Sequence, residues 1–189
     1  MSINIIFAIT KDYYFSSKDN DLPWKEVLKE KYNIDRIVED QMFFKDITVS
    51  KNNNENVLIM GRNTYMSIGK PLPNRINIVI SNKLKHFTNT NYTNLYFVSS
   101  IKEAIDKGKE LSKGNIFIIG GADIIKDSII HNEEYNIDNI YVTEVDGIEI
   151  KEGNKLFYKI PDNFKKQNVS KINSKYYLLE FIKYVKNKI

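Results

Sequence analysis

The sequence predicts an α/β protein in which a mainly parallel, mixed sheet is flanked by helices. Three observations support this. Short apolar runs alternate with helical patterns along most of the chain. The runs at 76–80 and 116–119 are almost entirely apolar, which is typical of strands covered on both faces. The last two strand-like segments, 165–172 and 176–185, have no helix between them, so we expect an antiparallel strand pair at one edge.

Each element follows from its local pattern. Besides the final pair, we expect strands at residues 3–9, 56–60, 76–80, 95–98, 115–121 and 139–145, and helices at 35–50, directly after Gly61, at 100–113 and at 122–130. Ser100 with Glu103 predicts a capping box, and Asp35 is the expected cap of its helix. The polar segments 10–24, 52–56 and 89–94 are expected loops. A chain of 189 residues fits one domain, 1–189.

Composition excludes several classes of protein. The chain has no cysteine and two histidines, so we expect neither disulfides nor a metal site. No apolar run approaches the roughly 20 residues of a membrane helix, and the N-terminus lacks a basic leader. We therefore expect a cytoplasmic protein without a membrane partner. The net charge of +4 comes largely from lysines near the C-terminus, but the aromatic residues there lie in a strand-like run, so we expect no nucleic-acid partner.

The segment 36–48 places a carboxylate in an apolar stripe. Helical spacing puts Ile37, Phe43 and Phe44 on one face, and Asp40 lies among them. One interpretation is an ordinary surface pair with Arg36, four residues earlier. The other is a desolvated acid placed for chemistry. These residues alone leave both open.

Two glycine-containing turns lie between a strand and a helix. Gly61 precedes one helix, and Gly120 and Gly121 precede another. Ligands of open α/β sheets bind beyond the carboxyl ends of strands, where glycine lets a phosphate approach the backbone. Such a turn can also be merely a tight connection. Neither turn matches the dinucleotide or P-loop fingerprint, but two together suggest a nucleotide with more than one phosphate.

The segment 67–81 carries a stiff turn. Pro71 and Pro73 restrict the backbone, and Arg75 then enters a strand. An arginine delivered in this way can bind a carboxylate with fixed geometry. A surface arginine after a turn is the alternative.

In combination these segments resemble the dihydrofolate reductase family. The motifs LPW (22–24), Asp40 followed by FFK, the run 59–81, IIGGADII (118–125) and IYVTEVDG (140–147) occur in that family's order. The resemblance implies an eight-stranded mixed sheet on which NADPH and 7,8-dihydrofolate meet. It further implies hydride transfer to pterin C6, protonation of N5 assisted by Asp40, and binding of antifolates.

The resemblance also implies residue roles. Asp40 corresponds to the catalytic carboxylate, Trp24 to a tryptophan that orders water beside it, and Thr143 to a threonine that holds it. The implied substrate-binding residues are Ile6, Phe44, Ile68, Leu72 and Arg75. The implied cofactor-binding residues are Ala8, Gly61, Arg62, Asn63, Thr64, Ser81, Asn82, Lys83, Ile119, Gly120, Gly121, Ala122 and Ile124.

The sequence departs from the family's pattern between Trp24 and Asp40. The spacing is longer than usual, and the additional residues within 25–36 predict an extra helical turn or loop. Glu39 is the neighbouring acid, and we expect it to face solvent.

Three further departures lie near the cofactor. Ser17 replaces a loop glycine, Ile125 replaces a tyrosine, and Asp123 stands where a basic residue can meet the 2′-phosphate. We expect NADPH to be preferred nonetheless, through Arg62 and Lys83.

Two rival functions remain at this level. A pyrimidine reductase of riboflavin synthesis lacks the helix acid with its LPW partner, so Asp40 argues against it. A catalytically silent subunit, for instance beside thymidylate synthase, is permitted by the changes at Ser17 and Ile125. Nothing in the sequence demands self-association, and we expect a monomer.

Overall fold

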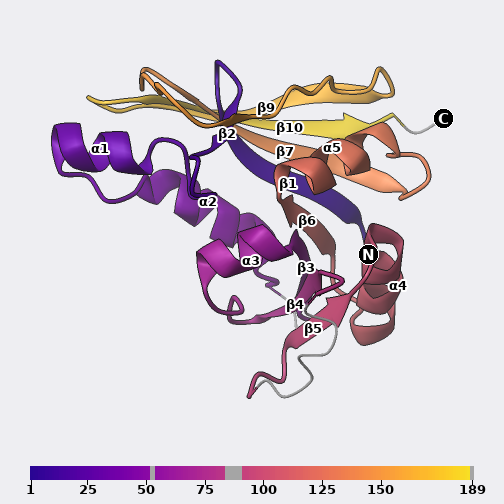
Figure 1. Ribbon diagram of the computed structural model, residues 1–189. Helices are drawn as coiled ribbons and strands as arrows, with labels where there is room; N and C mark the ends of the chain where they lie inside the picture. Colours follow the sequence, from indigo (N-terminus) through magenta and orange to yellow (C-terminus); the bar gives the residue numbers. More distant parts are fainter. Residues whose placement is uncertain (52–53, 84–90, 188–189) are drawn as a thin grey trace.

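The computed structural model describes residues 1–51, 54–83 and 91–187. Its main sheet has eight strands in the order β5-β4-β3-β6-β1-β7-β10-β9 (Figure 1). The strands are β1 (Ile3–Thr10), β3 (Asn56–Gly61), β4 (Arg75–Ile80), β5 (Leu95–Val98), β6 (Ile116–Gly120), β7 (Ile137–Asp146), β9 (Phe164–Asn173) and β10 (Leu178–Lys186). Neighbours from β5 to β7 are parallel, whereas β10 runs antiparallel to both β7 and β9. The predicted mixed sheet with a C-terminal antiparallel pair is confirmed.

Helices cover both faces of this sheet. They are α1 (Lys25–Tyr32), α2 (Val38–Thr48), α3 (Arg62–Ile68), α4 (Ile101–Leu111) and α5 (Ala122–Ile130). Figure 1 shows α1, α2 and α3 on one side of the sheet and α4 and α5 on the other. Because side chains alternate along a strand, Ile5 and Phe7 of β1 join the core under α4 and α5, while Ile6 and Ala8 face α2 and α3. The candidate site occupies this second face.

The helix boundaries differ most from the expectation at the start of α2. The helix expected at 35–50 begins at Val38, and its N-cap, Ile37, provides no side-chain cap. The expected cap, Asp35, instead pairs with Lys29 Nζ at 2.5 Å. At α4 the expected cap is present, since Ser100 Oγ accepts a hydrogen bond from the Glu103 amide at 3.1 Å. The Glu103 carboxylate accepts from the Ser99 amide, one residue before the expected partner.

Three elements were not predicted as such. The residues expected to form an extra turn or loop form the two-turn helix α1, which buries Leu28 and is followed by its C-cap, Asn33, in a left-handed conformation. The polar segment 10–24 contains β2 (Tyr14–Ser16), which pairs with β8 (Asn154–Lys155). Parts of the expected loops 52–56 and 89–94 lie outside the described residues, as does His86. None of the helices in the described ranges is long and apolar enough to cross a membrane.

Candidate active site

The first turn of α2 buries an acid. The Asp40 side chain is only 8% exposed, and the Thr143 hydroxyl donates a hydrogen bond to its carboxylate. Burial raises the pKa of Asp40 from 3.8 to about 6, against the lowering effect of Thr143. Arg36 is exposed and precedes α2, and no ion pair among the described residues joins it to Asp40. The surface-pair interpretation therefore does not hold.

Thr143 reaches Asp40 because of where β7 lies in the sheet. Within the sheet, Thr143 is paired with Ala8 of β1 on one side and with Phe181 of β10 on the other. Phe181 in turn packs against Phe43 of α2, with ring centroids 4.4 Å apart. The helix carrying the acid is thus fixed to the strand that carries its hydrogen-bond donor.

Trp24 lies in the core beside the same helix face. It is fully buried and packs in a cluster with Ile37 and the half-buried Phe43, the residues three before and three after Asp40. Its Nε1 atom is buried and has no hydrogen-bond partner among the described residues. A buried indole N–H normally finds a partner, so this donor marks a place for an ordered water or a polar ligand atom.

Apolar candidates for substrate binding gather on one surface. Ile6, Phe44, Ile68 and Leu72, from β1, α2, α3 and the turn before β4, belong to one hydrophobic cluster, which also includes Ile119. Phe44 is only half-buried. The structure therefore brings together four of the five residues implied as substrate-binding.

Arg75 is a buried cation at the start of β4. It is 5% exposed, its Nε donates to the Pro73 carbonyl at 3.0 Å, and its Nη1 donates to Thr48 Oγ1 at 2.9 Å. Its guanidinium carbon lies 5.9 Å from the Phe44 ring centroid. Burial lowers the pKa of Arg75, and no carboxylate of the described residues is within ion-pair distance. This arginine is not a surface residue, and an anionic ligand group would complete its surroundings.

Asp40 and Arg75 mark the two ends of α2. Arg75 contacts Thr48, eight residues after Asp40, and a rise of about 1.5 Å per residue separates the two ends by about 12 Å. The apolar cluster with Phe44 lies between them. This arrangement fits an elongated ligand with a flat hydrogen-bonding head, an apolar middle and an anionic tail.

Three glycines bring two turns together on the cofactor side. Strand β6 lies beside β3, so a Cβ added at Gly61 would be 3.4 Å from the Gly121 amide nitrogen. Gly120 has a φ of 145°, and a Cβ there would lie 3.1 Å from Thr64 Oγ1. The backbones of these two turns therefore approach each other closely, and the half-buried Gly121 leaves its backbone partly accessible at the N-cap of α5. Such a surface fits the pyrophosphate of a dinucleotide.

Most of the other cofactor candidates lie at the same edge of the sheet as these glycines, whereas Ala8 lies within β1. Ser81 follows β4, which flanks β3 on its other side, and its amide donates to the Val98 carbonyl at 2.8 Å. The exposed candidates are Arg62, Asn63, Asn82 and Lys83, and the half-buried ones are Ile119, Ala122 and Ile124. All lie at or next to the carboxyl ends of β4, β3 and β6. Asp123 is exposed in the first turn of α5.

The structure shows surroundings of Glu39 and Ile125 that the sequence did not predict. Glu39 does not face solvent as expected: it is half-buried and accepts a hydrogen bond from the Tyr177 hydroxyl at 2.9 Å. Ile125 is fully buried in the core under α5, where an apolar side chain is well accommodated.

Ser17 lies in a loop that is tied to a neighbouring segment. Its amide donates to the Asp21 carbonyl at 2.8 Å, and its carbonyl accepts from Asn154 Nδ2 at 2.9 Å. The loop that follows β2 is thereby joined to β8.

Sequence reasoning also missed polar residues that support Arg75. Thr48 and Asn77 are fully buried, and Asn56 is nearly so. Asn77 is the single polar residue in the run 76–80, which is the signal that could have revealed it.

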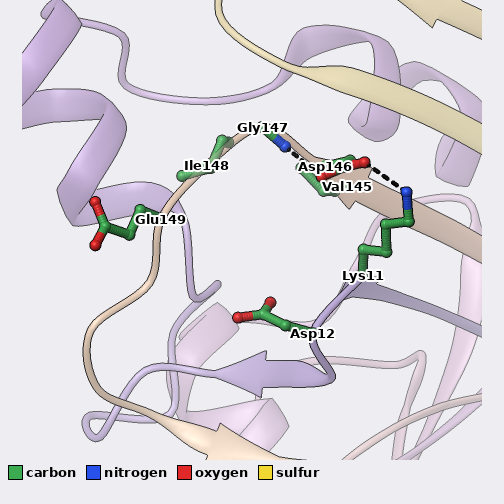
Figure 2. Close-up of a pocket in the computed structure, with 7 residues that line it drawn as sticks. All are labelled: Lys11, Asp12, Val145, Asp146, Gly147, Ile148 and Glu149. Carbon is green, nitrogen blue, oxygen red and sulfur yellow. Dashed lines mark hydrogen bonds and ion pairs between the residues drawn. The ribbon is translucent and has the colours of Figure 1, made fainter.

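A separate surface hollow lies outside the candidate active site. It has a volume of about 420 Å³ and lies between the end of β1 and the segment after β7. Figure 2 shows the residues that line it, which are Lys11, Asp12 and residues 145–149. Lys11 Nζ pairs with Asp146 Oδ2 at 2.9 Å across one side of it. None of the candidate site residues lines this hollow.

Comparison with known proteins gives a consistent result. The family model described as dihydrofolate reductase matches residues 2–186. The chain is 33% identical over 159 residues to a dihydrofolate reductase of Buchnera aphidicola subsp. Baizongia pistaciae, covering 80% of this chain and 83% of that protein. It is 33% identical over 145 residues to dihydrofolate reductase of Bacillus subtilis, covering 76% and 68%.

A plant relative and a solved structure extend the comparison. A bifunctional dihydrofolate reductase-thymidylate synthase of Arabidopsis thaliana is 32% identical over 151 residues, which are 75% of this chain but 24% of that protein. The fold matches that of dihydrofolate reductase from Enterococcus faecalis, a structure complexed with NADP(H), with a TM-score of 0.69, 23% identity and coverage of 99% and 97%. A buried acid on α2, the paired glycine turns and these matches along nearly the whole chain lead to one conclusion: the protein belongs to the dihydrofolate reductase family.

Proposed function

We propose that this chain reduces 7,8-dihydrofolate to 5,6,7,8-tetrahydrofolate with NADPH, the reaction of its family, on the face of the sheet covered by α2. A hydride is added to pterin C6 and a proton to N5, so one proton is consumed for each NADPH oxidised. When bound, NADPH supplies the hydride. The observation that carries the proposal is the buried carboxylate of Asp40, with its raised pKa, on the helix that Trp24 contacts through Phe43. Among the described residues the buried indole N–H of Trp24 has no hydrogen-bond partner.

Asp40 has two tasks in this proposal. Near neutral pH its carboxyl group is largely ionised and can accept two hydrogen bonds from the ring N–H and amino group of a pterin, while Thr143 holds its orientation. Because its pKa is about 6, Asp40 also makes protonation within the site more favourable. A water molecule held by Trp24 Nε1 can then pass a proton to N5. We expect the rate of hydride transfer to fall as the pH rises above about 6.

Arg75 binds the other end of the substrate. The α-carboxylate of the glutamate tail is the anion that its buried guanidinium lacks, and Thr48 and Pro73 hold the guanidinium in place. Leu72 forms a wall of the pocket for the benzoyl group, and Phe44, in the same apolar cluster, lies nearer to the pterin ring.

NADPH binds across the glycine turns. We propose that Arg62 and Lys83 favour it over NADH by contacting its 2′-phosphate, in spite of Asp123. The Michaelis constants for both cofactors test this, and a lower value for NADH contradicts it. Asp123→Asn should lower the Michaelis constant for NADPH and leave that for NADH unchanged.

The decisive experiment is an assay of the purified chain with 7,8-dihydrofolate and NADPH, in which tetrahydrofolate is identified as the product. Formation of tetrahydrofolate supports the proposal. Reduction of a riboflavin-pathway pyrimidine in its place, or binding without turnover, would establish one of the two rival functions.

The proposal includes a cytoplasmic monomer that acts as one domain over residues 1–189. The plant bifunctional relative makes association with thymidylate synthase the partner to test. Gel filtration tests whether the chain is a monomer, and limited proteolysis tests whether it forms one domain. Cell fractionation tests its compartment, and co-purification tests its association with thymidylate synthase.

A further inference from the structure

The turn between Pro71 and Arg75 is held by two asparagine side chains. Asn77 is fully buried in β4, where its Oδ1 accepts from the Leu72 amide at 2.9 Å and its Nδ2 donates to the carbonyls of Leu72 and Arg75, both at 2.9 Å. One side-chain amide therefore satisfies both backbone groups of Leu72, much as a neighbouring strand would.

Asn94, just before β5, adds a second amide to the same carbonyls. Its Nδ2 donates to the Arg75 carbonyl at 3.0 Å and to the Leu72 carbonyl at 3.3 Å. Its own carbonyl accepts from the Asn77 amide at 2.7 Å, so the two asparagines are also joined to each other. Both amides thus converge on the backbone of Leu72 and Arg75.

This turn cannot rely on a regular ladder. Asn74 adopts a left-handed conformation with a φ of 58°, and β4 begins only at Arg75. The Leu72 carbonyl lies outside any strand or helix, and the two side-chain amides provide it with hydrogen-bond donors. A backbone group that is removed from water needs such partners.

The same turn presents two groups of the candidate substrate site. Leu72 contributes its side chain to the apolar cluster with Phe44, and the guanidinium of Arg75 is aimed by Thr48 and Pro73. The backbone atoms that set the positions of these two side chains are the ones that Asn77 and Asn94 hold.

We propose that Asn77 and Asn94 are positioning residues for the tail of the substrate. They fix the distance between the apolar wall at Leu72 and the cation at Arg75, and so they determine how tightly a substrate with an anionic tail is bound. This inference rests on the proposed function. It concerns binding of the tail and not the chemistry at the pterin ring, which takes place at the opposite end of α2.

The test compares two substrates that differ only in the tail: 7,8-dihydrofolate and a 7,8-dihydropterin that lacks the aminobenzoylglutamate group. For Asn94→Ala, we expect KM for 7,8-dihydrofolate to rise about threefold to tenfold, as for one or two lost hydrogen bonds, with kcat unchanged. KM for the dihydropterin should not change. Asn77→Ser should show the same pattern with a larger effect, and Asn94→Ala remains informative if the more buried variant folds poorly.

Two controls separate positioning from a general loss of structure. Asn139→Ala removes another half-buried amide, which donates to Asn4 Oδ1 at 2.7 Å in a different part of the sheet, and should change neither KM. In an Arg75→Ala background, Asn94→Ala should have little further effect on KM for 7,8-dihydrofolate, because the cation that it positions is gone.

The possible outcomes are distinct. Equal increases in KM for both substrates, a loss of kcat, or full additivity with Arg75→Ala would overturn the inference and leave the proposed function intact. A wild-type chain that does not reduce 7,8-dihydrofolate at all would overturn both.

Discussion

A buried charged group lies at each end of α2, Asp40 at its first turn and Arg75 beside its last, and the surroundings of the two groups differ. At the first turn, Asp40 has Thr143 as its hydrogen-bonding side chain, and burial raises its pKa to about 6. At the last turn, Arg75 is held by Thr48 and by its own turn through Pro73. Burial lowers the pKa of Arg75 as well, yet a guanidinium remains charged throughout the accessible pH range.

This difference separates two tasks. A group that must gain and lose a proton is kept in apolar surroundings, where its protonation changes close to neutral pH. A group that must present a permanent charge is surrounded by hydrogen bonds that fix its direction. The comparison predicts that substitutions at the Asp40 end change rates and their pH dependence, whereas substitutions at the Arg75 end change binding.

The largest effect is expected for Asp40→Asn. Loss of the group that favours a proton near N5 should lower the rate of hydride transfer about 10²-fold to 10⁴-fold near neutral pH. NADPH binding should be unchanged, because the glycine turns are elsewhere. Single-turnover measurements check the rate, and wild-type turnover in this variant would show that another group handles the proton.

The next largest effect is expected for Arg75→Leu. Losing a charge-assisted contact with the substrate carboxylate should raise KM for 7,8-dihydrofolate about tenfold to hundredfold, with kcat nearly preserved. Steady-state kinetics measure both constants, and thermal unfolding controls for the lost contact with Thr48. A fall in kcat at constant KM would contradict the division between the two ends.

The pH dependence of stability should show the burial of Asp40. Its pKa rises from 3.8 in ordinary surroundings to about 6, so the folded chain binds this proton more tightly than the unfolded chain. The free energy of unfolding should therefore decrease as the pH rises from about 4 to about 6, by about 3 kcal/mol from this group.

Urea unfolding of the wild type and of Asp40→Asn across this pH range isolates the effect. The variant lacks the ionisable group, so the difference between the two curves is the contribution of Asp40. If the two curves run parallel, Asp40 is not desolvated in the free protein.

The smallest effect is expected for Thr143→Val. The hydroxyl lowers the pKa of Asp40, so its removal should raise that pKa, and the pH at which hydride transfer declines should rise by about one unit. Thr143→Ser retains the hydroxyl and should behave like the wild type. An unchanged pH profile in Thr143→Val would mean that burial alone sets the pKa.

Local patterns in the sequence were sufficient for much of the fold. The apolar runs located the strands of the parallel part of the sheet, and Ser100 identified the start of α4. The helical spacing around Asp40 correctly placed its side chain with the apolar stripe. These features depend on the alternation and periodicity of neighbouring residues, which a single segment carries by itself.

Contacts between distant segments needed the tertiary structure. The sequence did not reveal that β6 lies beside β3 and so brings Gly120 to Gly61, or that Thr48 meets Arg75. The inward turn of Glu39 towards Tyr177 was likewise missed.

The order of residues along the chain was enough to predict which side chains face the core and which family the chain resembles. Which of those side chains meet became clear from the folded sheet. Local periodicity records the face on which a residue lies, whereas the order of the strands is set by packing of the whole sheet against its helices.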